Sequence, residues 1–125
     1  MVVGVGLDLV ELDRVGRALD RWGVRLIAKL MDEPESCRLP EERAARVRAV
    51  ALAIAGKEAA SKAIGTGWSR GVFWRHVVVE PGPPPAVTLH QRAAEVARTL
   101  GSGGRTRTRL EVRDNLVLGE VWLLA

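Results

Sequence analysis

Hydrophobic and polar positions alternate with a period of two over residues 2–10, which predicts a β-strand. One face of this strand carries only apolar side chains: Val3, Val5, Leu7 and Leu9. The other face carries Gly4, Gly6 and Asp8. Because glycine has no side chain, another backbone or a ligand can come close to the face that holds Asp8. Asp8 therefore either lies in a groove or, as a residue near a strand end, caps the following helix.

Residues 12–21 follow a helical period instead, with Leu12 and Val15 among the apolar positions. Three basic residues lie on the flank of this predicted helix: Arg14, Arg17 and Arg21. The segment therefore predicts an amphipathic helix with a basic side. Such a side is usually exposed to solvent and has no binding partner. Residues 22–41 are less regular, and we expect a short helix over 26–31 followed by a turn-rich link.

The segment from Glu41 through Ala63 is rich in alanine and predicts a long helix that ends before the Gly65-Thr66-Gly67 turn. Its apolar stripe consists of Val47, Val50, Ala51 and Ile54. Two further steps of four residues along the same stripe reach Glu58 and then Lys62. Charges on a buried stripe indicate a pocket mouth or a bound ligand. The alternative is a surface ion pair between Glu58 and Lys62.

The remaining chain predicts a hairpin, a helix and two further strands. Residues 71–80 and 87–89 have extended patterns on either side of a turn at 82–85, and residues 90–100 return to helical spacing. Residues 106–113 and 116–124 predict two strands that meet at Asp114-Asn115. Arginines alternate with threonine and apolar residues along 105–113, and they form either a charged open sheet face or a phosphate-binding ladder. The order of elements predicts an α+β fold, with a small antiparallel sheet packed on the long helix.

Composition narrows the class of protein. A chain of 125 residues predicts a single domain over 1–125, and no apolar run is long enough to cross a bilayer. The apolar N-terminus is not preceded by a basic segment, so we expect no secretory signal. The single cysteine, Cys37, cannot form an internal disulfide, which favours the reducing cytoplasm. The net charge of +4 favours acidic partners in general.

Two segments resemble the holo-acyl-carrier-protein synthases, which are short 4'-phosphopantetheinyl transferases. The first is VGLDLVELDR over residues 5–14, and the second is AGKEAASKAIGTG over residues 55–67. Members of this family transfer the phosphopantetheine arm of coenzyme A to a serine of an acyl or peptidyl carrier protein and release 3',5'-ADP. The resemblance implies the same fold and activity and a homotrimer with active sites between protomers. We expect no membrane partner, and a nucleic-acid partner is the least favoured alternative.

The resemblance also implies roles for individual residues. Asp8 and Glu58 would bind Mg²⁺ together with the coenzyme A diphosphate, Glu58 or a water would accept the serine proton, and Lys62 would stabilise the departing diphosphate. The residues implied in coenzyme A binding are Lys57, Ser61, Lys62, Gly65, Gly67, Arg109 and Arg113. The residues implied in carrier-protein binding are Arg14, Arg17 and Arg21.

Two departures from the family pattern motivate alternative functions. Family members have a Ser-x-Ser-His segment in the strand that reads RLEVRD over residues 109–114 of this chain. They also have an arginine followed by an aromatic residue where this chain has Ala53 and Ile54. One alternative is therefore a catalytically altered member that binds a carrier protein or its acylated arm. Another is a nucleic-acid contact along the arginines of 105–113, although no aromatic residues are interleaved with them.

Overall fold

The computed structural model describes all residues, Met1–Ala125. It has eleven elements, of which the longest is a central helix. In chain order these are β1 (Val2–Glu11), α1 (Leu12–Trp22), α2 (Val24–Leu30), α3 (Glu33–Cys37), α4 (Arg43–Ala63), the 3₁₀ turn η1 (Trp74–His76), β2 (Val77–Glu80), β3 (Ala86–Leu89), α5 (Gln91–Thr99), β4 (Thr106–Arg113) and β5 (Leu116–Leu124). Strands β1, β5 and β4 form an antiparallel sheet in that order, and β2 pairs with β3. The predicted α+β fold, with a small antiparallel sheet on a long helix, is confirmed.

Helix α4 lies under the sheet at a distance that only glycine permits. A Cβ atom at Gly4, Gly6 or Gly119 would overlap a backbone carbonyl of α4. The carbonyls belong to residues spaced by four, namely Ala63, Ala59 and Ala55 respectively. Residues four apart share one helix face, so a ridge of alanines on α4 lies in a groove of glycines on β1 and β5. The predicted close approach at the glycine face of β1 is therefore made by the backbone of α4.

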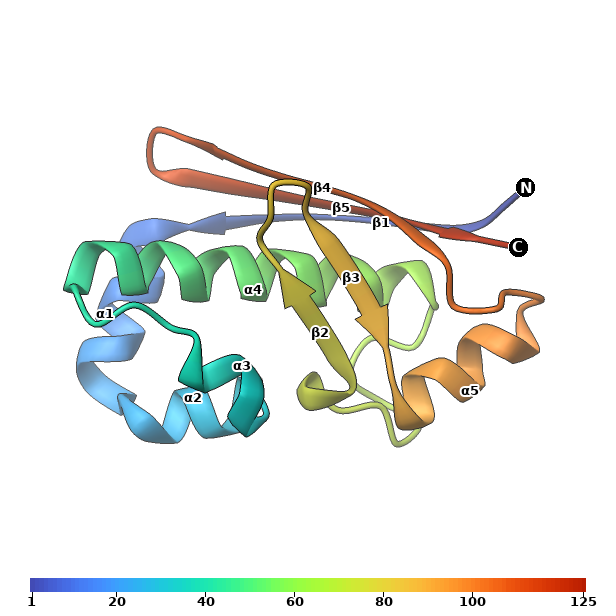
Figure 1. Cartoon of the computed structure of the whole chain (residues 1–125), viewed down its shortest axis with the longest axis horizontal. Coiled ribbons are helices and arrows are strands. Elements are labelled where there is room, and N and C mark those ends of the chain that lie inside the picture. The colour runs from blue at the N-terminus through green and yellow to red at the C-terminus, as the bar shows by residue number, and fades with distance from the viewer.

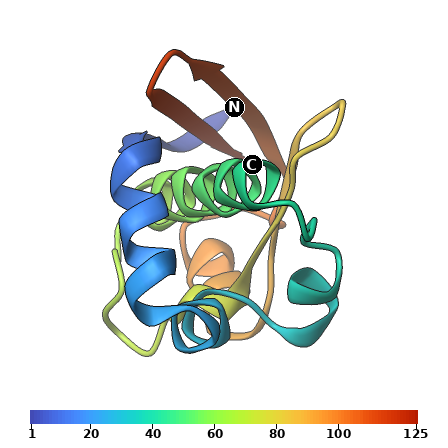
Figure 2. The same cartoon turned by 90° about the vertical axis from the view of Figure 1, so that its left-hand side faces the viewer.

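The other elements cover the sides of α4 that the sheet leaves free. In Figure 1 the sheet lies above α4, while α1, α2, α3, the β2–β3 hairpin and α5 lie below it or cross beside it. Figure 2 shows α1 running beside the start of α4. The buried apolar residues form two clusters, one between α4, α5 and the hairpin and the other between α1, α2 and the first half of α4. Val50 and Ala51 of the predicted stripe are fully buried in the second cluster.

Two segments differ from the sequence-based expectation. The predicted strand over 71–80 is a strand only from Val77, because a tight turn precedes it. In this turn the backbone N–H of Phe73 donates to Nδ1 of His76, at 3.2 Å, and the side-chain bond replaces strand pairing. The link after residue 31, expected to be rich in turns, contains the short helix α3, whose Asp32 side chain accepts a hydrogen bond from the Glu35 N–H as an N-cap.

The outer face of the sheet, directed away from α4, is unusually apolar. On β1 the residues Val5, Leu7 and Leu9 are 54%, 51% and 61% exposed. Their cross-strand neighbours on β5 include Trp122, which is 37% exposed. An isolated exposed apolar residue needs no explanation, but a contiguous row of them marks an interaction surface. No helix has the length and apolar character to span a membrane, and the thiol of Cys37 is exposed.

Substituting Gly6 with alanine tests the close packing of α4 on the sheet. The added methyl group overlaps the backbone of α4, which cannot move aside as a flexible side chain can. We expect Gly6→Ala to lower the free energy of unfolding by about 3 kcal/mol, at the upper end of what overpacking costs. Urea unfolding measures this loss. Gly103→Ala is the control, because nothing lies within 4 Å of a Cβ there, and equal stability of the two variants would contradict the packing.

Stability should also depend on His76 in mildly acidic solution. Burial, assisted by the positive charge of Arg75, lowers the pKa of His76 from its ordinary value of 6.5. Just below pH 6.5 the unfolded chain therefore binds more protons than the folded chain. The free energy of unfolding rises with pH over this range and no longer depends on His76 above pH 6.5. In His76→Asn, whose amide oxygen can still accept from Phe73, unfolding measured from pH 5 to 7 should show a smaller slope. Identical slopes would rule out His76 as the titrating group.

Candidate active site

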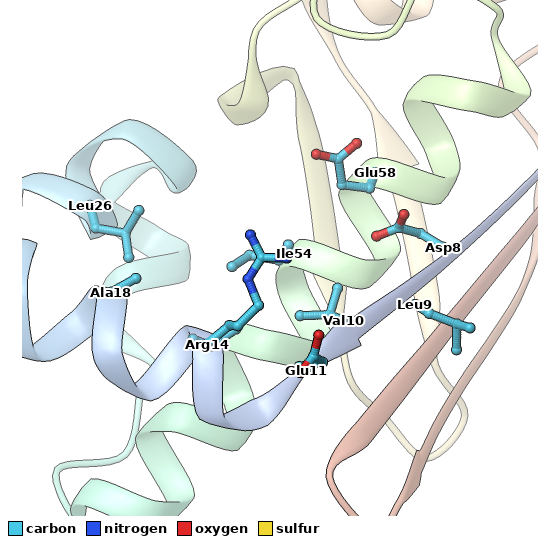
Figure 3. A pocket seen from close by; sticks show the side chains of 10 residues that line it. Asp8, Leu9, Val10, Glu11, Arg14, Ala18, Leu26, Ile54 and Glu58 are labelled. Carbon is cyan, nitrogen blue, oxygen red and sulfur yellow. The ribbon is translucent and has the colours of Figure 1, made fainter.

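A cavity of about 390 Å³ opens where β1, α1, α2 and α4 meet. Its lining residues are Asp8, Leu9, Val10, Glu11, Arg14, Val15, Ala18, Leu26, Ile54 and Glu58. Figure 3 shows the carboxylates of Asp8 and Glu58 near one end of this group and the apolar side chains of Ala18 and Leu26 near the other. The cavity therefore combines a charged end with an apolar end. The sequence pointed to its two acids, to Arg14 and to Ile54, whereas Leu26 gave no signal before the fold was known.

Asp8 reaches this cavity from the glycine face of β1. Its side chain is 19% exposed, and Oδ1 accepts a hydrogen bond of 2.9 Å from Nζ of Lys62 on α4. Lys62 Nζ also donates to the backbone oxygen of Leu7, at 3.0 Å. Asp8 is therefore not a helix cap, since Glu11 occupies the N-cap position of α1. The ion pair of Lys62 is made with Asp8 across the two elements, and not with Glu58 along the helix.

Glu58 enters from α4, one turn beyond Ile54, as the apolar stripe predicted. Its side chain is half-buried and lines the same cavity as Asp8. The carboxylates of Glu58 and Asp8 project on the same side of α4 in Figure 3, from two elements 50 residues apart in the chain. The glycine–alanine contact is what brings them together, because it holds β1 against this part of α4.

Arginines of α1 border the cavity and the surface beside it. Arg14 lines the cavity, and Figure 3 shows its side chain extending from α1 toward Ile54. Arg17 lies on a neighbouring groove of about 480 Å³ that also contains Arg43 and Arg48. Arg21 is exposed, with its guanidinium 4.9 Å from the ring centroid of Trp22. All three arginines implied in carrier-protein binding are thus on one exposed helix next to the carboxylates.

Lys57 and Ser61 lie away from the cavity. Lys57 is fully buried and forms an ion pair with Glu35 of α3, with Nζ 2.9 Å from Oε1. Burial lowers the pKa of Lys57 from its ordinary value, and the Glu35 carboxylate opposes that shift. The hydroxyl of Ser61 donates to the backbone oxygen of Glu58, at 2.7 Å, and is also buried. Both side chains therefore have hydrogen-bond partners inside this chain, and their contact with coenzyme A stays a prediction.

Gly65 and Gly67 occupy the turn after α4 for conformational reasons. Their φ angles are +81° and +54°, in the left-handed region that favours glycine at the end of a helix. A Cβ at either position would meet nothing within 4 Å. The turn is therefore open at these positions, and the backbone angles alone explain the glycines.

Arg109 and Arg113 lie on the outer face of the sheet, opposite the face that carries Asp8. In the cross-strand register, Asp8 is level with Gly119 and Leu110 on the inner face. Because successive strand residues alternate between faces, Arg109 points outward. It forms an ion pair of 2.9 Å with Glu111 on the same face. Within one chain neither arginine reaches the cavity.

The donor set of the cavity fits a hard divalent cation only in part. No three histidine, cysteine or acidic side chains are arranged so that they could together hold a metal ion. Two carboxylates supply the oxygen ligands that Mg²⁺ prefers, and this ion commonly takes its other ligands from water and substrate phosphates. The cavity could therefore hold Mg²⁺ together with a phosphate-bearing substrate.

Comparisons with known proteins identify the family of this chain. The sequence model of the 4'-phosphopantetheinyl transferase superfamily matches residues 4–113. A holo-[acyl-carrier-protein] synthase of Methylobacterium sp. (strain 4-46) is 37% identical over 127 residues, covering 99% of this chain and 93% of that protein.

Solved structures show the same fold. The holo-[acyl-carrier-protein] synthase of Neisseria meningitidis superposes with a TM-score of 0.84 at 22% identity, covering 100% of both chains. The enzyme of Helicobacter pylori, solved in complex with coenzyme A, superposes with a TM-score of 0.79 at 16% identity, covering 96% of this chain and 99% of that one.

Proposed function

This chain belongs to the 4'-phosphopantetheinyl transferase superfamily, and we propose that it is a holo-acyl-carrier-protein synthase. It transfers the 4'-phosphopantetheine arm of coenzyme A to a serine of an apo-acyl or apo-peptidyl carrier protein. The observation that carries the proposal is the meeting of Asp8 and Glu58 in one cavity beside a basic helix. Transfer from a nucleotide to a protein requires that both substrates be held side by side. The charged end of the cavity can hold the diphosphate, and the adjacent basic helix can hold the carrier protein.

The residues of the cavity divide the chemistry between them. Asp8 and Glu58 would hold Mg²⁺, which when bound neutralises negative charge on the coenzyme A diphosphate. Glu58, or a water next to it, accepts the proton of the carrier serine as the serine oxygen bonds to phosphorus and the bond to 3',5'-ADP breaks. Lys62 keeps Asp8 oriented through the 2.9 Å ion pair and adds positive charge beside the departing diphosphate.

The carrier protein docks on α1. Arg14, Arg17 and Arg21 are exposed along this helix, and Arg14 also lines the cavity. Positive groups on the docking surface would steer an acidic recognition helix toward the cavity and orient its serine. The three arginines follow one another along α1, and Arg14 is the one that lines the cavity with the two carboxylates.

The outer face of the sheet supports assembly into a homotrimer. Its exposed row on β1, formed by Val5, Leu7 and Leu9, is apolar enough to be buried against copies of the same chain. Arg109 and Arg113 share this face, so assembly would carry them toward the site of a neighbouring protomer. There they would contact coenzyme A phosphates, and the pairing of Arg109 with Glu111 would offset the repulsion of that carboxylate.

We place the protein in the cytoplasm. The exposed, unpaired thiol of Cys37 is compatible with a reducing compartment. Coenzyme A and apo-carrier proteins, the two substrates of the proposed reaction, are the partners expected there.

Transfer is tested by incubating the protein with coenzyme A, Mg²⁺ and candidate apo-carriers. We expect intact-protein mass spectrometry to show the added phosphopantetheine arm, with the reaction stopped when Mg²⁺ is removed by a chelator. Glu58→Gln should lower kcat at least a hundredfold, because it removes both a metal ligand and a proton acceptor. Glu80→Gln, an exposed change at the end of β2, is the matched control. No mass gain on any carrier would contradict the function.

Assembly is tested by light scattering during size-exclusion chromatography. The wild-type chain should elute with about three times the mass of one chain. Leu7→Lys places a charge in the apolar row and should yield monomers with an unchanged far-UV spectrum. Val24→Lys is the control, because Val24 on α2 is 82% exposed and lies away from the sheet face. A wild-type monomer at micromolar concentration would exclude the trimer.

A further inference from the structure

The ion pair between Lys57 and Glu35 is the only buried one in the chain, with side chains 0% and 3% exposed. Lys57 Nζ donates to Oε1 of Glu35 at 2.9 Å, to the backbone oxygen of Trp74 at 3.2 Å and to the backbone oxygen of Val77. The second carboxylate oxygen of Glu35 accepts from the N–H of Val79, at 3.3 Å. All three ammonium hydrogens are therefore used, and one residue of α4 is bonded to α3, η1 and β2.

This ion pair lies on the side of α4 that faces away from the sheet. The sheet side is marked by Ala55, Ala59 and Ala63, and with about 100° of rotation per residue Lys57 points nearly opposite to them. The alanine–glycine contacts set the distance between α4 and the sheet and which face of α4 meets it, but as van der Waals contacts they do not by themselves fix small rotations of the helix. The hydrogen bonds of Lys57 are directional, so they define how α4 is rotated about its own axis.

Rotation of α4 matters because Glu58 is the next residue in the chain. A side-chain carboxylate stands about 6 Å from the helix axis, so a roll of about 10° moves it by roughly 1 Å. A displacement of that size at a reacting group can lower a rate by about a hundredfold. The direction of Glu58 thus depends on how firmly its neighbour, Lys57, is held.

We propose that Lys57 and Glu35 are positioning residues of the transfer site, whose ion pair fixes the rotation of α4 and thereby aims Glu58 at Asp8. This inference rests on the proposed function and extends it to two residues that do not touch the substrates. Stability alone is a weak explanation for the pair, because replacing a buried ion pair with uncharged groups of similar volume is often neutral for stability.

The test uses the double variant Lys57→Met/Glu35→Gln in the full chain. It leaves no buried charge unpaired, and the new amide oxygen at position 35 can still accept from Val79, so the chain should fold. A single Lys57→Met would isolate the Glu35 carboxylate in the core and is less informative. Circular dichroism and thermal unfolding establish the fold. Mn²⁺ binding, followed by electron paramagnetic resonance, reports the metal ligands independently of turnover.

We expect the folded double variant to bind Mn²⁺ about tenfold more weakly and to lose roughly ten- to a hundredfold in kcat, while its Kd for the apo-carrier stays within about threefold. The matched control is Val50→Ala, which opens a cavity in the core of α4 at a fully buried residue away from the ion pair. It should lose stability and keep its Mn²⁺ affinity.

Two outcomes would overturn the inference. In one, the folded double variant binds Mn²⁺ and turns over within about twofold of wild type. In the other, carrier binding weakens as much as Mn²⁺ binding, which would indicate general loosening. Failure of the wild-type protein itself to bind Mn²⁺ or to transfer the arm is a separate result, and it would refute the proposed function instead.

Discussion

The close contact between α4 and the sheet is the constraint on which the remaining structure depends. Gly4, Gly6 and Gly119 leave room for the backbone of α4, whose alanines pass over them at intervals of one turn. This contact joins residues from the two ends and the middle of the chain, and it runs along the strand that carries Asp8. Without it, a carboxylate at the eighth position and another at position 58 would have no reason to meet.

A second set of contacts holds α4 from the opposite side. The ion pair of Lys57 and Glu35 supplies directional bonds where the alanine face supplies only proximity. Lys62 adds a third connection, since it bonds to Asp8 and to the backbone of Leu7 and so ties α4 to β1 at the edge of the cavity. Different residues of α4 thus have different roles. The alanines set the distance from the helix to the sheet, Lys57 restricts the rotation of the helix, and Lys62 aligns Asp8 at the cavity.

The sequence predicted those parts of this arrangement that depend on local patterns. Alternation around Gly4 and Gly6 predicted a strand face that another backbone could approach closely, and the stripe that continues to Glu58 and Lys62 predicted charged groups at a pocket mouth. The 3₁₀ turn before Val77 was not predictable from periodicity, because it is closed by a bond from Phe73 to His76. Helix α3 did carry a signal, since Asp32 and the proline two residues later are typical of a helix start.

Partners of buried charges were the least predictable part, and Lys57 shows why. Its place in the family-like segment favoured contact with coenzyme A, yet Lys57 precedes Glu58 by one residue, a step of about 100° around the helix, so the two side chains leave α4 in different directions. That angle was available from the sequence, but its partner Glu35 lies 22 residues away on a helix of five residues. Such pairings are set by tertiary packing.

The two acids and the two arginines implied in the reaction lie on opposite faces of the sheet. Asp8 and Glu58 lie on the side of α4, whereas Arg109 and Arg113 lie on the outer side with the exposed apolar row of β1. In a chain that acted alone, these arginines would serve as a charged sheet edge, with Arg109 paired to Glu111, and the apolar row would remain in water. If copies of the chain meet at that face, burial of the apolar row and delivery of the arginines follow from the same contact. The exposed apolar row of β1 is unfavourable for a monomer, and its burial between copies of the chain would also account for the placement of Arg109 and Arg113.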